Sequence, residues 1–230
     1  MPALRYPPSV TIAGKTCQEF DEISSDEFVS IIRQGHMPTS SQPAIGEVAA
    51  ADLFKNDAHM TVVNSRTLCG PHRYAVEKAV QWAKEGHGVK QIVEKLEEKL
   101  NSAKSFLVPA DFDYLRRGGR LSPLVSYVGK AASLTPIMTQ TDDGCRLTIA
   151  GIRRGFPPAV KFIASALEKH GVGDNWRIYI SHAGALDKAE LALKHLKETF
   201  PKAVLETLPL SPAFITQGGP NCVAVQVIRA

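Results

Sequence analysis

The chain has 230 residues, enough for one large domain or two small ones. Hydrophobic residues make up 44% and charged residues 22% of it, as in an ordinary globular protein. The net charge is only +4, and no run of Lys and Arg interleaved with aromatics appears, which argues against a nucleic-acid partner. No apolar stretch approaches the roughly 20 residues that span a bilayer, and we expect no secretory signal.

Motifs of the common enzyme classes are missing from the sequence. The four cysteines, Cys17, Cys69, Cys145 and Cys222, are far apart and form no C-x-x-C pair, so neither a metal site nor a disulfide framework is predicted. We expect them to be small buried side chains in a reducing cytoplasm. A P-loop, a zincin helix and a G-x-S-x-G elbow are also lacking. No nucleophile, base and orienting group can be assembled from the sequence.

Strands and helices alternate in the first half of the chain. Residues 9–12 and 60–63 are short apolar or β-branched runs that predict strands. Residues 24–35, 72–85 and 89–100 have apolar side chains at helical spacing, the first segment beginning with a capping box. This alternation predicts a parallel sheet, in which ligands bind beyond the carboxyl ends of the strands.

The central stretch, residues 106–138, carries the most distinctive pattern. A strand at 106–108 precedes an amphipathic segment at 111–117, which is broken by Gly118-Gly119. A new helix follows from Leu121-Ser122-Pro123, and residues 134–138 predict another strand. Backbone N–H groups of the glycine pair and the neighbouring arginines could cradle an anion, but a tight turn with exposed arginines explains them equally.

Hairpins and long helices dominate the second half. The pattern predicts a hairpin turn at 140–144, helices at 157–169 and 186–200, and strands at 146–149, 176–180, 204–208 and 222–228. Such a mixture is typical of an α+β domain with a mainly antiparallel sheet. The predicted fold class is therefore α/β, with an N-terminal parallel-sheet domain at 1–115 and a C-terminal α+β domain at 116–230.

Three stretches together resemble the DegV family. Residues 116–122, RRGGRLS, followed by an apolar helix and the strand LTPIM, are similar to the signature of that family. Residues 39–43, TSSQP, resemble its Thr-Ser-Gln-Pro loop, and residues 215–220, ITQGGP, resemble its C-terminal Thr-His-Thr-Gly-Pro motif. The three stretches occur in the family's order and cover nearly the whole chain.

The resemblance implies a protein that is not an enzyme and needs no cofactor. It would bind a long-chain fatty acid such as palmitate and present it to a separate fatty-acid kinase. The hydroxyls of Ser40 and Thr39 would hold the carboxylate, and Gln217 would stand where the family has a histidine. No transmembrane segment is implied, although transient contact with a membrane surface is compatible with such a role.

The resemblance also implies where the acyl chain would lie. It would occupy an apolar tunnel between the two domains, lined by Leu121, Leu124, Val125, Leu134, Ile137, Thr216 and Gly219. Arg117 and Arg120 would then form an anion site or a surface for the partner kinase.

A second interpretation stays open at this point. The chain could be an enzyme that acts on a phosphorylated or acylated small molecule, with the Arg-Gly-Gly-Arg loop as its anion site. A polar cleft near Arg120 and His182 would then replace the apolar tunnel. In either case three guanidinium groups around one anion would repel one another. At least one arginine of the loop should therefore face solvent or pair with Asp111 or Asp113.

One element of the family is not found in the chain. Between the Ser-Gln-Pro loop and the strand at 60–63, the family places a helix, a strand, a second serine loop and another helix. Here residues 47–54 read like the start of one helix joined to the end of another. Losing a buried parallel strand is costly because its neighbours expose unpaired backbone groups. We therefore expect the sequence to lack segments at its start and near residues 48–50.

Overall fold

The computed structural model describes residues 63–117, 121, 134–141, 146–210, 214–215 and 218–230, and the backbone of residues 11–12 and 15–16. The chain divides into two compact units, Met1–Asn64 and Ser65–Ala230. In the first unit, β1 (Thr11–Ile12) pairs antiparallel with β2 (Lys15–Thr16). The helix predicted at 24–35 and the rest of the predicted parallel sheet lie outside the described residues.

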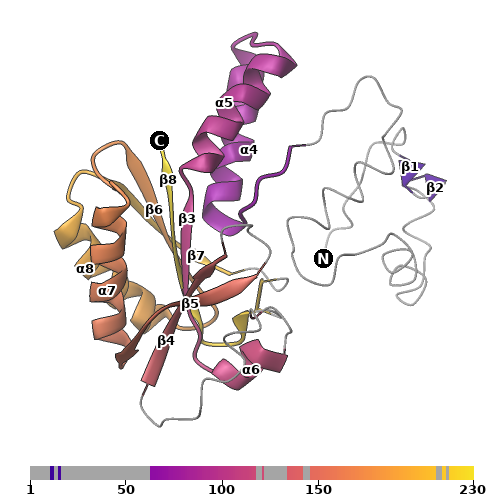
Figure 1. Cartoon of the computed structure of the whole chain (residues 1–230). Coiled ribbons are helices and arrows are strands. Elements are labelled where there is room, and N and C mark those ends of the chain that lie inside the picture. Colours follow the sequence, from indigo (N-terminus) through magenta and orange to yellow (C-terminus); the bar gives the residue numbers. More distant parts are fainter. Residues whose placement is uncertain are drawn as a thin grey trace. The chain divides into compact units, whose positions relative to one another are not determined.

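Six strands of the second unit form one mixed sheet (Figure 1). They are β3 (Lys104–Val108), β4 (Leu134–Gln140), β5 (Leu147–Arg154), β6 (Trp176–His182), β7 (Val204–Pro209) and β8 (Val223–Arg229). Their order across the sheet is β5-β4-β3-β8-β6-β7, and only β6 and β7 run parallel. The predicted α/β class and the largely antiparallel character of this sheet are confirmed.

Five helices of the second unit are described: α4 (Cys69–Lys84), α5 (Val89–Asn101), α6 (Phe112–Arg117), α7 (Phe156–Lys169) and α8 (Leu186–Thr199). The helices predicted at 72–85, 89–100, 157–169 and 186–200 and the segment at 111–117 are confirmed to within a few residues, while the helix predicted from Leu121-Ser122-Pro123 lies outside the described residues. Figure 1 shows α7 and α8 side by side on one face of the sheet, while α4 and α5 extend from the other side. None of the described helices combines the length and apolarity needed to cross a membrane.

The hairpin of β4 and β5 is longer than predicted. The strand expected at 146–149 continues to Arg154, and its added residues pair with the start of β4, so that Ile152 lies opposite Pro136. Because β3 pairs with β4 only at Met138 and Thr139, Pro136 has a neighbouring strand on one side alone. A sheet tolerates a residue without a backbone N–H at such a position.

One face of the sheet is covered by α7 and α8, and we call it the helix-covered face. Side chains at alternating positions of four strands point to it, because successive strand residues face opposite sides. These side chains belong to Phe106, Val108, Ile137, Ile178, Ile180, Val223, Val225 and Val227. The helices fill the space above them at helical spacing with Val160, Ile163, Leu167, Ala189, Ala192 and Leu196.

The predicted domain boundary between residues 115 and 116 falls inside the second unit. β3 precedes that boundary in the sequence, yet it is a central strand paired with β4 and β8. Residues 65–115 therefore fold together with the C-terminal half. The division of the whole chain into two domains remains a prediction, and the join expected near residues 48–50 lies outside the described residues.

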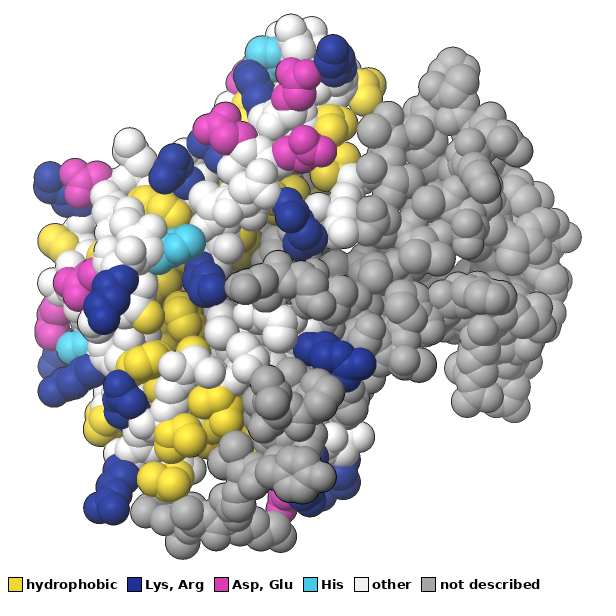
Figure 2. Space-filling view, viewed as in Figure 1, with side chains coloured by type: hydrophobic (Ala, Val, Ile, Leu, Met, Phe, Trp, Pro, Cys, Tyr) yellow, Lys and Arg dark blue, Asp and Glu magenta, His cyan; other side chains and the backbone are white. Residues whose placement is uncertain are grey.

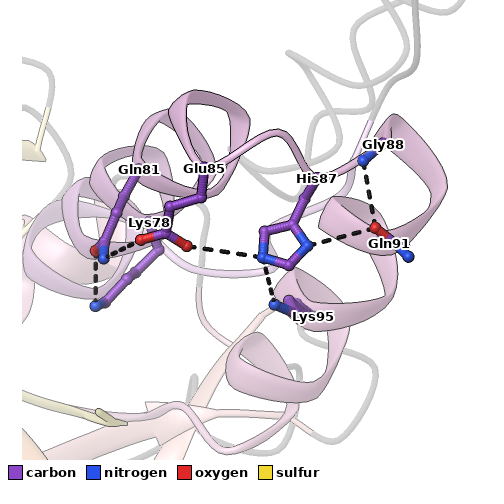
Figure 3. A network of polar contacts seen from close by, with 7 residues as sticks. All are labelled: Lys78, Gln81, Glu85, His87, Gly88, Gln91 and Lys95. Atoms are coloured by element: carbon purple, nitrogen blue, oxygen red, sulfur yellow. Dashed lines mark hydrogen bonds and ion pairs between the residues drawn. The ribbon is translucent and has the colours of Figure 1, made fainter.

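A polar network around His87 holds the turn between α4 and α5 (Figure 3). His87 Nδ1 lies 3.4 Å from Gln91 Oε1, and Lys95 Nζ lies 3.1 Å from His87 Nε2. Gln91 Oε1 also accepts a hydrogen bond from the Gly88 N–H at 3.3 Å, and Glu85 Oε2 is 3.7 Å from His87 Nε2. Because an ammonium group only donates, the contact with Lys95 makes Nε2 an acceptor, and the contact with Gln91 then places the ring proton on Nδ1.

Candidate functional site

The second face of the sheet carries an apolar cluster of its own. Leu107, Met138 and Ala224 alternate along β3, β4 and β8 with the residues of the helix-covered face. Leu115 of α6, which is fully buried, covers them. We use the name second face for this cluster, whose buried members are Leu107, Leu115, Leu121, Met138, Ala183, Leu210, Cys222 and Ala224.

Two glycines allow the C-terminal segment to pack closely at this face, Gly219 against α6 and Gly218 against Phe214 and Cys222. Gly219 has a φ of +85°, and a Cβ there would lie 3.0 Å from Cδ1 of Tyr114. A Cβ at Gly218 would lie 2.9 Å from Cε1 of Phe214 and 3.1 Å from Sγ of Cys222. A larger residue at Gly219 would therefore push the segment away from α6, and one at Gly218 would displace Phe214 or Cys222. The structure thus brings together two of the three stretches that resemble DegV motifs.

Backbone hydrogen bonds fix the end of β6 beside the same segment. The N–H of Ala183 donates to the Cys222 carbonyl at 3.0 Å, and the N–H of Asn221 donates to the Ala183 carbonyl at 2.7 Å. The N–H of Leu210 donates to the His182 carbonyl at 2.9 Å. The carboxyl ends of β6 and β7 and the start of β8 therefore meet at the edge of the second face.

Among the predicted lining residues, Leu121 belongs to the second face. It is 6% exposed and bridges to Leu147, and its carbonyl accepts a hydrogen bond from Arg146 at 3.4 Å. Leu134, at the start of β4, is 41% exposed. Ile137 is fully buried, but it lies in the helix-covered face. Leu121 and Ile137 are therefore on opposite faces of the sheet and do not line one cavity.

Two arginines of the RRGGR stretch have carboxylate partners in α6 or just before it. Arg116 Nη2 lies 3.1 Å from Asp113 Oδ1, and Arg117 Nη2 lies 3.8 Å from Asp111 Oδ2. The Arg117 guanidinium also lies over the Tyr114 ring, 5.8 Å from its centroid. The prediction that at least one arginine of the stretch pairs with Asp111 or Asp113 is confirmed.

Several predicted site residues lie outside the described residues, and their roles remain predictions. They are Thr39, Ser40, Arg120, Leu124, Val125, Thr216 and Gln217. His182 is described: by strand alternation it shares the face of Ile178 and Ile180, away from the second face. Its buried Nδ1 has no hydrogen-bond partner within the described part of the chain.

Two thiols report how apolar the second face is. Cys222 is fully buried in it, and the partly buried Cys69 at the start of α4 packs against it. Burial raises the pKa of Cys222 to about 11. Burial, reinforced by the neighbouring Cys222, raises the pKa of Cys69 to about 11 as well. An environment that disfavours a thiolate suits an apolar ligand better than a charged one.

Residues that the sequence interpretation omitted make up most of the second face. Leu107, Met138 and Cys222 were not among the predicted lining residues, although strand alternation could have placed the first two on one face. Tyr114 was missed because its contact with Gly219 depends on tertiary approach, which no local pattern encodes. Within the described residues, no group of three or more His, Cys, Asp or Glu side chains could hold a metal ion.

Comparison with known proteins confirms the family to which the three stretches point. A protein-family model described as "uncharacterised protein, DegV family" matches residues 48–230. The chain belongs to the DegV family. A DegV domain-containing protein of Staphylococcus aureus is 25% identical over 254 residues, covering 97% of this chain and 90% of that protein. Because this alignment is longer than the chain's 230 residues, the relative has residues in the matched region that this DegV chain lacks.

Solved DegV structures share the fold. A fatty acid binding DegV family protein from Streptococcus agalactiae has a TM-score of 0.71 at 23% identity, covering 78% of this chain and 64% of its own. This chain therefore spans less than two thirds of that protein. A DegV family protein from Eubacterium eligens, loaded with heptadecanoic acid, has a TM-score of 0.71 at 15% identity, covering 84% of this chain and 71% of its own. Both are described by the lipid they bind, not by a reaction.

Proposed function

We propose that this chain binds a long-chain fatty acid whose acyl chain lies against the second face of the sheet. The observation that carries the proposal is the apolar cluster beneath α6, in a family whose solved members include fatty-acid-bound structures. The acyl chain would contact Leu107, Leu121 and Met138. Ile137 is not part of the proposed lining because its side chain lies in the helix-covered face.

The acyl chain would supply most of the affinity. Burying roughly 14 methylenes of palmitate at about 0.8 kcal/mol each is worth on the order of 11 kcal/mol before the costs of ordering. Each hydrogen bond to the charged head group would add about 1.5–3 kcal/mol. The tail therefore determines how tightly the ligand binds, and the polar contacts determine its direction.

The carboxylate would be held by the hydroxyls of Ser40 and Thr39, with the amide of Gln217 as a further donor. A serine in place of the family's threonine keeps the hydroxyl and loses only a methyl group. An amide does not titrate, so Gln217 would give affinity that is independent of pH where a histidine changes charge.

We further propose that the bound fatty acid, palmitate or one of similar length, is presented in the cytoplasm to a separate fatty-acid kinase. A carrier of this kind needs no catalytic group because the partner performs the phosphorylation. The side chain of Arg117 is 67% exposed beside the second face and is available to such a partner.

Native mass spectrometry of protein purified without added lipid tests the proposal directly. We expect a protein mass increased by one long-chain fatty acid, which denaturation releases for identification. After lipid removal, isothermal titration should give saturable palmitate binding with one site per chain. A protein that carries no lipid and shows no saturable palmitate binding would refute the proposed function.

The role of Ser40 can be tested separately. Ser40→Ala should weaken palmitate binding by about 1–3 kcal/mol, the cost of leaving a charged acceptor without one hydrogen bond. Ser165→Ala, which removes an exposed hydroxyl from the outer surface of α7, is the matched control and should bind palmitate normally. Unchanged affinity in the Ser40 variant would remove this residue from the site while leaving the proposed acyl-chain contacts intact.

A further inference from the structure

A groove with a basic rim lies between the outer surface of α7 and the edge strand β5. Its volume is about 550 Å³. Arg153 of β5 and Lys161 and Lys169 of α7 provide the rim, and Pro158, Phe162 and Ala166 provide an apolar floor. Because α7 covers the helix-covered face, this groove is on the opposite side of the sheet from the second face.

The wall of the groove is built by close packing rather than by loose surface side chains. A Cβ at Gly151 would lie 2.7 Å from Cζ of Phe162, so a glycine in β5 allows the ring to rest directly on the strand. The Arg153 guanidinium stacks over the same ring, 4.4 Å from its centroid, and donates to the Ile152 carbonyl at 2.7 Å. Both contacts hold the cation in place over the aromatic ring.

The positive charges of the groove have no counter-charge in the described structure. Arg153, Lys161 and Lys169 are exposed, and none of them forms an ion pair with another described residue. None of the described residues that line the groove is acidic. Figure 2 shows Lys and Arg side chains over the region of α7 and α8, interspersed with hydrophobic and some acidic side chains.

We propose that this groove binds an acidic segment of a partner protein. Carboxylates of the segment would pair with Arg153, Lys161 and Lys169, and one apolar side chain would lie on Phe162. Charge complementarity favours an acidic partner. The concave shape favours a peptide segment over an anionic bilayer, whose broad surface meets protruding cations more readily than a recessed apolar floor. A partner bound here would leave the second face free for a fatty acid.

Fluorescence anisotropy with the full chain and a short fluorescein-labelled peptide, glutamates around one phenylalanine, tests the proposal. Saturable binding is expected, weakened at least about tenfold by Lys161→Glu/Lys169→Glu, because two attractive contacts become repulsive. Lys194→Glu/Lys197→Glu is the matched control: it makes the same charge change at exposed positions of α8. It should keep the affinity within about twofold, since salt screens charges outside the groove.

Three results would overturn the proposal. The first is a peptide that does not bind saturably, and the second is an equal loss in both double variants, which would indicate attraction to overall charge. The third is that the chain does not bind the peptide but floats with phosphatidylglycerol vesicles, and that Lys161→Glu/Lys169→Glu abolishes this flotation. That result would mean that the groove binds a membrane surface. A peptide with serine in place of phenylalanine should bind more weakly, and equal affinity would refute the role of the apolar floor. Circular dichroism melts check that all variants are folded.

Discussion

The two faces of the six-stranded sheet are both apolar, but the chain covers them by different means. Two helices of 14 residues each close the helix-covered face, and their inward side chains such as Ile163, Leu167 and Leu196 are fully buried. On the other side of the sheet, α4 packs over β6 and β8, and the second face is covered in part by the six-residue α6 and by the segment around Gly218 and Gly219.

This difference gives the two faces different roles in the proposed function. A face closed by long helices at regular spacing contributes to stability whether or not a ligand is present, because its side chains already fill the space. A face covered by short segments needs less rearrangement to admit an apolar chain. Binding there would then stabilise the folded protein in proportion to ligand concentration, as any ligand of the native state does.

Ile137 and Met138 give the sharpest test of that separation. They are adjacent on β4 and both fully buried, but they belong to opposite faces. Each change to alanine should lower the free energy of unfolding by about 2–5 kcal/mol. Only Met138→Ala should also reduce the extra stability that saturating palmitate confers, because only this side chain contacts the proposed acyl chain.

Urea unfolding with and without palmitate measures both quantities for each variant. Equal palmitate-induced stabilisation in the Ile137 and Met138 variants would show that the second face does not bind the acyl chain. A larger loss of this stabilisation in the Ile137 variant would place the ligand under α7 instead.

Local patterns in the sequence predicted where the helices and strands lie better than they predicted which strands pair with one another. The helices at 157–169 and 186–200 were predictable because apolar residues recur at helical spacing over several turns. The pairing of β3 with β8 was not, because it joins Phe106 to Val225 across most of the second unit. For that reason the sequence placed a domain boundary after residue 115, although β3 lies in the middle of the sheet.

For the candidate site too, the sequence indicated some of the residues but not how the fold arranges them. The family motifs pointed to Leu121 and Gly219, and the structure places Leu121 in the second face and Gly219 against α6. Ile137 was grouped with them because apolar residues of its strand were assigned to the lining without regard to the face they point to. Adjacent strand residues, however, point to opposite faces of the sheet. Cys69 was not predicted to lie near Cys222, since their proximity depends on how α4 meets the sheet.

The thiols of the second face provide a test of how apolar it is. The pKa of Cys69 and of Cys222 is about 11 instead of 9.0, because burial disfavours the thiolate. At pH 8 their thiolate fraction should therefore be about a hundredfold smaller than that of an exposed cysteine, and alkylation should slow accordingly. Folded-state stability from these neutral thiols is present below pH 9.0 and is lost as the pH rises toward 11.

Iodoacetamide labelling followed by peptide mass spectrometry measures each site separately, with the urea-unfolded chain as the control. Labelling rates near pH 8 that match those of the unfolded chain would show that these thiols are not enclosed in an apolar environment.

A substitution at Gly70 tests how closely α4 must approach β6, on the side of the sheet opposite to α7 and α8. A Cβ at Gly70 would lie 2.2 Å from Cγ of the fully buried Tyr179 on β6. Gly70→Ala should therefore destabilise the protein by about 1–3 kcal/mol, although alanine is the better helix former by about 1 kcal/mol. Gly173→Ala is the control because a Cβ there meets only open space. Thermal unfolding should show a stability loss for the first variant and a change within about 0.5 kcal/mol for the second. Similar melts for both variants would mean that α4 can move away from β6 without cost.

The smallest effect is expected from the ion pair that joins α4 to the edge of the sheet. Arg73 Nη2 lies 2.7 and 2.8 Å from the two carboxylate oxygens of Glu206 on β7. Both side chains are partly exposed, at 43% and 34%, so water and salt screen their attraction.

A double-mutant cycle with Arg73→Gln and Glu206→Gln should give a coupling of about 0.2–1 kcal/mol that declines in high salt. If α4 is held mainly by the packing of residues such as Gly70 and Tyr74, this coupling adds little to its attachment. A coupling well above that range, insensitive to salt, would mean that charge and not packing fixes α4 against the sheet.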